Sequence, residues 1–186
     1  TTLEEALEHF TGLTGHDVIR VMEGWIGGPV PRAFHDAMGE ASRRALEEGI
    51  EPIAGAIEFV RALPPDRAKA VASSSSTRWI RTHLDHLGLR DAFEPHLYSG
   101  KEHVTSGKPA PDLYLYAADQ LRVDIRRTVI LEDSRIGVKG ALASGARVIG
   151  IAVGKHCLEG HADALFDLGA EHVAHSFDDV RALLAV

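Results

Sequence analysis

The chain has 186 residues, of which 45% are hydrophobic and 25% are charged, and its formal net charge is −7. This length and composition predict one domain, or one domain with a small appendage, that is stable without disulfides. The acidic balance argues against nucleic acid as a partner. The lack of an apolar run of about 18 residues argues against a membrane span. The single cysteine, Cys157, suits a reducing, cytoplasmic setting.

The first 50 residues carry helical patterns alone. Apolar residues recur at helical spacing over 3–10, 18–25 and 32–48, and a Gly- and Pro-rich loop at 26–31 separates the second pattern from the third. Gly49 follows the third pattern, as glycine often does at the end of a helix. We therefore expect residues 1–50 to form a small helical module.

From residue 51 onward, short strands alternate with helices. After a helix at 54–63, strands are expected at 68–72, 96–99, 128–131, 147–153 and 172–174. Helices are expected near 77–87, 111–121, 135–144, 160–168 and 177–185. Continuous apolar strands in such an alternation predict a doubly wound α/β domain at 51–186, in which helices cover both faces of a parallel sheet.

Polar clusters follow three of the expected strands. The run Ser73–Thr77 follows the first strand, Glu132 and Asp133 follow the third, and the loop after the second contains Lys108. Because ligands bind at the carboxyl ends of the strands in such sheets, we expect the three clusters to face one site. Gly107 and Lys108 are not part of a P-loop motif, so a nucleotide site of that type is not expected.

Each cluster has a functional and a structural interpretation. The serine run can bind an anion together with the following helix N-terminus, or it can simply cap that helix. Lys108, held extended by Pro109, can meet the charge of that anion or lie in solvent beside a helix start. Glu132 and Asp133 repel each other unless a cation such as Mg²⁺ is present, or they simply face a helix N-terminus. Together, the functional interpretations predict a phosphoryl-transfer site that lacks a nucleophile.

The chain resembles the haloacid dehalogenase superfamily, in particular its phosphatase and β-phosphoglucomutase-like branch. The matching stretches are EPIAGAIEFVRAL (51–63), VASSSS (71–76), HLGLRDAF (86–93), GKPAPDLYLYAA (107–118) and VILEDSRIGVKGALASGARVIGI (129–151). The resemblance implies a Rossmann-like core at 51–186, a partial helical cap at 1–50, Mg²⁺ as cofactor and a small phosphorylated metabolite as substrate.

The resemblance also implies roles for individual residues. Ser73 would hold the transferred phosphoryl group with its hydroxyl, and Ser74 would donate its backbone N–H to the same oxygens. Lys108 would bridge the nucleophile and the phosphoryl group. Asp133 would be a Mg²⁺ ligand, and Glu132 would assist it directly or through water.

Further candidates for phosphate or substrate binding lie nearby in the sequence. They are Ser75, Arg78 at the start of the next helix, and His16 with its neighbours Asp17 and Arg20. Their alternative is ordinary surface polarity. In the same loop, Gly15 stands where the mutases of this branch have a phosphate-binding arginine, which favours a phosphatase over a sugar-phosphate mutase.

The first motif of the family, Asp-x-Asp-Gly, does not occur in this sequence. In the family it follows the central strand, and its two aspartates are the nucleophile and the general acid/base. We therefore expect an N-terminally truncated chain that lacks this strand, has a gap in its sheet and is inactive by itself. The alternative is a non-catalytic binding protein on the same fold.

The 11 histidines raise a different possibility, a transition-metal site. His83 and His86 are spaced for one face of a helix, and His172 and His175 lie near a strand end. Neither pair has a cysteine partner or a second motif at zinc-site spacing, so we do not expect zinc there. The sequence carries no signal for the oligomeric state.

Overall fold

Three helices that follow the sequence patterns form the helical part of the protein. The computed structural model describes residues 2–185, and this part contains α1 (Leu3–Phe10), α2 (Gly15–Ile26) and α3 (Arg32–Glu48). Thr2 and Thr14 cap the first two helices, because their side chains accept hydrogen bonds from backbone N–H groups of the first turn. Gly49, with φ of 82°, ends α3 where the sequence predicts.

The rest of the chain alternates helices with short strands. The strands are β1 (Val71–Ser73), β2 (Leu97–Ser99), β3 (Val129–Glu132), β4 (Arg147–Ile151) and β5 (His172–Ala174). The helices are α4 (Ala56–Ala62), α5 (Thr77–His86), α6 (Arg90–Phe93), α7 (Asp112–Leu121), α8 (Arg135–Ala143), α9 (His161–Asp167) and α10 (Phe177–Leu184), with one 3₁₀ turn, η1 (Ile125–Arg127). All five expected strands are present, but β1 begins three residues later than predicted. The four-residue helix α6 is too short to show a helical period, and the sequence did not predict it.

The strands form two parallel sheets instead of one. β1 pairs with β2, whereas β3, β4 and β5 pair in that order, and every pair is parallel as expected. Within residues 2–185, no ladder of backbone hydrogen bonds joins β1 to β3. The expected parallel sheet is therefore present in two parts, with a gap between them.

Helices cover both faces of the three-stranded sheet. Successive strand residues point to opposite faces, and β4 separates two apolar clusters in this way. Val148 packs with Val138 of α8 and Leu165 of α9, whereas Ile149 packs with Val180 of α10 and with α4. A third cluster attaches α7 to the two-stranded sheet. Each fully buried side chain of this size contributes about 1.5–3 kcal/mol relative to exposure.

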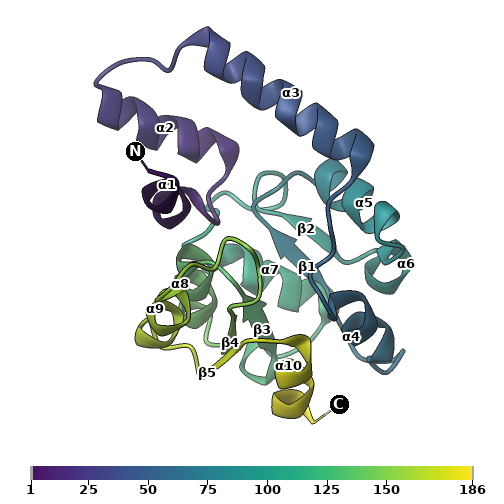
Figure 1. The fold of residues 1–186 in the computed structure, drawn as a ribbon. Helices are drawn as coiled ribbons and strands as arrows, with labels where there is room; N and C mark the ends of the chain where they lie inside the picture. Colours follow the sequence, from purple (N-terminus) through teal and green to yellow (C-terminus); the bar gives the residue numbers. More distant parts are fainter. Residues whose placement is uncertain (1, 186) are drawn as a thin grey trace.

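The helical part lies along one side of the two sheets (Figure 1). The end of α3 lies against α5. At this contact, a Cβ placed on Gly49 would touch the ring of His86. The residues of α2 and α3 are all described, and none of them is buried. We propose that the division into cap and core falls near residue 50. Within the described residues, no helix is long and apolar enough to span a membrane.

Candidate functional site

The three polar clusters predicted from the sequence meet in one pocket of about 450 Å³. It opens at the carboxyl ends of β1 and β3, where Ala72 and Leu131 form part of its wall. Gly12, from the loop between α1 and α2, closes another side. The polar side chains that face it include Ser73, Ser75, Lys108, Glu132, Asp133 and His156. The parallel topology brings these residues together from distant parts of the chain.

The serine run divides its hydroxyl groups among three tasks. Ser76 caps α5, because its side chain accepts a hydrogen bond from the first turn of that helix. Ser74 Oγ donates to the carbonyl oxygen of Gly12 at 2.8 Å, which ties the helical part to the end of β1. Ser73 Oγ accepts a hydrogen bond from the backbone N–H of Ser75 at 3.1 Å. The structure therefore confirms the capping role for Ser76, and it places Ser73 and Ser75 in the pocket lining, where anion binding stays a prediction.

Lys108 forms a buried ion pair with Glu132. Its Nζ contacts Glu132 Oε1, and both side chains are only 7% exposed. Tyr114 donates its hydroxyl proton to the same oxygen at 2.7 Å, and its ring centre lies 5.0 Å from Lys108 Nζ. Burial, followed by the charge of Glu132, raises the pKa of Tyr114, so the phenol stays protonated and keeps donating. Lys108 is therefore a cation held in place, and not a lysine in solvent.

The second oxygen of Glu132 is anchored as well. Glu132 Oε2 accepts a hydrogen bond from Ser134 Oγ at 3.1 Å. Ser134 also caps α8, because its Oγ accepts from the backbone N–H of Gly137 at 3.0 Å. A Cβ on Gly137 would overlap the Glu132 carboxylate, so only glycine lets α8 begin this close to it.

Asp133 contacts the loop that follows β4. Its Oδ2 lies 3.1 Å from Nε2 of His156, and its side chain is 50% exposed. Burial acts to raise the pKa of Asp133, but the hydrogen bond to His156, the charges of that ring and of Lys108, and a backbone hydrogen bond together lower it. The same hydrogen bond raises the pKa of His156. His161 holds the backbone at this point, because its Nε2 donates to the carbonyl oxygen of Asp133 at 2.7 Å.

The two carboxylates therefore have separate partners, which differs from a pair whose repulsion one cation relieves. Successive residues at the end of a strand point to opposite sides, and Glu132 contacts Lys108 whereas Asp133 contacts His156. Mg²⁺ binds one or two carboxylates together with waters and substrate oxygens. Asp133, half-exposed at the pocket, fits a direct ligand. Glu132 has both oxygens in hydrogen bonds and fits an indirect role better.

Four of the predicted substrate-binding residues lie outside the pocket lining: His16, Asp17, Arg20 and Arg78. The side chain of His16 is 77% exposed in the first turn of α2, where it contacts Asp17 and Arg20. Arg78 is exposed at the second residue of α5. The described pocket wall includes none of the four.

Sequence reasoning missed two residues of the site, Tyr114 and His156. His156 had a usable signal, because it lies in the loop after β4 and strand ends of a parallel sheet meet at one edge. Tyr114 had a weaker one, its position in the helix that follows Lys108.

Known proteins and a known protein family resemble this chain in sequence. A family model described as haloacid dehalogenase-like hydrolase matches residues 1–151. Fructose-1-phosphate phosphatase YqaB of Escherichia coli (strain K12) is 31% identical over 121 residues, which cover 65% of this chain and 63% of that protein. Phosphorylated carbohydrates phosphatase of Thermotoga maritima is 30% identical over 138 residues, which cover 71% of this chain and 63% of that protein. The chain thus spans less than two thirds of the length of these two relatives.

Solved structures resemble the chain over its full length. A haloacid dehalogenase-like protein of unknown function from Agrobacterium tumefaciens str. C58 is 33% identical with a TM-score of 0.84, and the match covers 100% of this chain and 83% of that one. A family hydrolase from Deinococcus radiodurans R1, solved with bound phosphate and sodium, is 33% identical with a TM-score of 0.77, and the match covers 100% and 81%. Because the family model spans most of the chain and these folds agree with it, the chain belongs to the haloacid dehalogenase-like hydrolase family.

Proposed function

We propose that the protein is a Mg²⁺-dependent phosphatase whose substrate is a small phosphorylated metabolite of the sugar-phosphate class. The observation that carries this proposal is the meeting of Ser73, Lys108 and Asp133 in one pocket at the carboxyl ends of β1 and β3. Two relatives are named as phosphatases of fructose 1-phosphate and of phosphorylated carbohydrates, which supports the substrate class. The volume of about 450 Å³ lies in the range of small-molecule sites, about 300–1,000 Å³.

We expect Ser73 to bind a phosphoryl oxygen. Its Oγ accepts the backbone N–H of Ser75, so its own proton is directed to another acceptor. The contact of Ser74 with Gly12 fixes the loop beside it. Ser73 lacks a described contact with a base, so it is a binding group and not an activated nucleophile.

Lys108 supplies a fixed positive charge where negative charge develops on the transferred group. Glu132 and Tyr114 hold the ammonium group in position before substrate arrives. Such preorganised charges in a partly buried site act mainly on the transition state. When bound, Mg²⁺ would neutralise further charge on the phosphoryl oxygens, and Asp133 would be the residue that holds it.

The nucleophile of this mechanism is an aspartate outside residues 1–186. No Asp-x-Asp sequence occurs in the chain, and the pocket lies where the two sheets are not joined. We propose that a segment with this motif occupies the gap between β1 and β3 and forms an aspartyl-phosphate intermediate. Residues 1–186 alone are then expected to bind Mg²⁺ and phosphate weakly and to release no phosphate from substrates.

The test is Lys108→Met in a protein in which an Asp-x-Asp-Gly segment precedes residue 1. With a sugar phosphate as substrate, kcat is expected to fall by about 10²–10³-fold with little change in KM. Lys101→Met, at an exposed lysine after β2, is the matched control and should behave as wild type. A change confined to KM, or an equal loss in the control, would contradict the role given to Lys108. Free phosphate, and not an isomerised sugar phosphate, is the expected product.

A further inference from the structure

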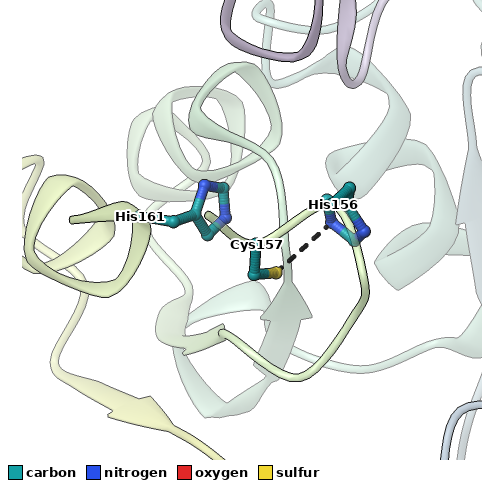
Figure 2. Close-up of side chains that lie close together, drawn as sticks. All are labelled: His156, Cys157 and His161. Carbon is teal, nitrogen blue, oxygen red and sulfur yellow. Dashed lines mark hydrogen bonds between the residues drawn. The ribbon is translucent and has the colours of Figure 1, made fainter. Parts of the chain in front are cut away.

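We propose that His156, Cys157 and His161 form a binding site for a borderline-soft divalent metal ion of the zinc type. One ligand atom from each side chain lies within 4.8 Å of the other two. Figure 2 shows the thiol of Cys157 between the two imidazole rings. In the part of the chain that the structure describes, no other three histidine, cysteine or acidic side chains converge in this way.

The distance between two of the ligand atoms already suits a shared metal ion. Cys157 Sγ and His156 Nε2 are 3.5 Å apart. In a tetrahedral zinc site with Zn–S of about 2.3 Å and Zn–N of about 2.0–2.1 Å, the sulfur and nitrogen are separated by about 3.6 Å. The sulfur–nitrogen distance itself therefore needs almost no change when a metal ion replaces the contact of His156 with Asp133.

His161 has the hydrogen bond that orients a metal-binding histidine. Its Nε2 lies 2.7 Å from the carbonyl oxygen of Asp133. A carbonyl oxygen only accepts, so Nε2 donates in this contact, and Nδ1 is the nitrogen that a metal ion would use. Histidines that bind metals usually donate their second ring N–H to a carbonyl or carboxylate in this manner, which fixes the tautomer.

The cluster has its own access to solvent. A second pocket of about 170 Å³ is lined by His156, His161 and Glu159, together with Leu7 of α1 and Thr11 just after it. His156 lines this pocket and also the larger one that contains Lys108. A metal ion can therefore reach the cluster without passing the proposed phosphate site.

A thiol nucleophile activated by histidine and aspartate fits these contacts less well. In a catalytic triad, the nucleophile and the carboxylate bind opposite nitrogens of the imidazole ring. Here Cys157 Sγ and Asp133 Oδ2 both contact Nε2 of His156. One nitrogen cannot relay a proton between them, whereas a metal ion on Nε2 needs only that the ring leave Asp133.

The preferred ion follows from the ligands. One sulfur and two imidazole nitrogens favour Zn²⁺ and its neighbours over Mg²⁺, which prefers oxygen. Three protein ligands leave a fourth tetrahedral position for water. The proposal concerns metal binding alone, and it holds whether or not the neighbouring pocket has phosphatase activity.

Cobalt(II) is the probe for this site, because a cobalt–thiolate bond gives an intense charge-transfer band. The chain is titrated with Co²⁺ in the presence of excess Mg²⁺, and then with Zn²⁺. We expect a band that saturates at one equivalent of Co²⁺ and disappears when Zn²⁺ is added. Cys157→Ser should abolish the band, and His161→Gln should weaken Co²⁺ binding by on the order of 10–100-fold. His172→Gln, at a half-exposed histidine of β5, is the matched control and should keep wild-type affinity.

Two results would overturn the proposal. One is the absence of a charge-transfer band in the folded wild-type chain at millimolar Co²⁺. The other is a His161→Gln variant, shown by circular dichroism to be folded, that binds Co²⁺ as wild type does. If Cys157→Ser fails to fold, His161→Gln still decides, because this partly exposed side chain has no role in the apolar clusters.

Discussion

The helical part and the α/β part are both built from amphipathic helices, yet they bury very different amounts of surface. Val138 and Ala141 of α8 are completely buried, whereas no residue of α2 or α3 is buried. At the end of α2, Trp25 is 49% exposed and Ile26 is 58% exposed. A helical apolar period therefore predicted helices correctly in both parts, but burial depends on which element packs opposite the apolar face.

The residues of the site also come unequally from the two parts. The charged groups Lys108, Glu132 and Asp133 all come from the α/β part, where helices and strands fix their positions. The helical part contributes Gly12, which accepts a hydrogen bond from Ser74. The α/β part should therefore set the geometry of the charges, whereas the helical part should set access to the pocket.

The largest expected effect is on the buried core. Leu165 of α9 is completely buried, and Leu165→Ala should lower the free energy of unfolding by about 2–5 kcal/mol. Ile26→Ala, at an exposed residue of α2, should change it by less than about 0.5 kcal/mol. Urea unfolding followed by circular dichroism measures both. Equal losses would mean that the helical part is as tightly packed as the core.

The next prediction compares two glycines in helices. A Cβ on Gly137 of α8 would overlap the Glu132 carboxylate, so Gly137→Ala should destabilise the fold by about 1–3 kcal/mol. Gly24 lies inside α2 with no atom within 4 Å of a built Cβ. Gly24→Ala should therefore stabilise the chain by about 0.5–1 kcal/mol. Changes of the same sign in the two unfolding midpoints would be inconsistent with the packing described here.

A smaller effect is expected at the contact between the two parts. Ser74→Ala removes the hydrogen bond to Gly12, worth about 0.5–1.5 kcal/mol. Amide hydrogen exchange should become faster in residues 11–14 while the rate in β3 and β4 is unchanged. Ser106→Ala, at an exposed serine, is the control. Unchanged exchange in residues 11–14 would show that other contacts hold this loop.

The smallest effect concerns pH. His83 is buried in α5, and within the described residues its two ring nitrogens have no hydrogen-bond partner. Burial, together with nearby His86, lowers the pKa of His83. Below the unfolded value of about 6.5, the unfolded chain takes up the proton first, so stability falls as pH falls.

The urea midpoint should therefore be lower at pH of about 5.5 than at about 7.5. His83→Phe should reduce this difference, and His35→Phe on the exposed face of α3 should leave it unchanged. A difference that is the same in all three proteins would assign it to other groups.

Much of the fold could be predicted because its signals are local. The bounds of α3, residues 32–48, follow from an apolar period and a terminal glycine, and the strand-end rule correctly brought Ser73, Lys108 and Asp133 to one pocket. The contact of His156 with Asp133 could not be predicted in this way, because it depends on the path of an irregular loop. The separate partners of Glu132 and Asp133 depend on which side each strand-end residue faces, which spacing alone does not determine.

Mg²⁺-dependent phosphate release tests the central claim most directly. In a protein that carries an Asp-x-Asp-Gly segment before residue 1, sugar-phosphate hydrolysis is measured against Mg²⁺ concentration for wild type, Asp133→Asn and, as control, the exposed Asp163→Asn. We predict saturable activation of wild type and of the control, and at least a 10²-fold lower rate with loss of this activation in Asp133→Asn. Superimposable curves for wild type and Asp133→Asn would contradict the assignment of the metal site to this pocket.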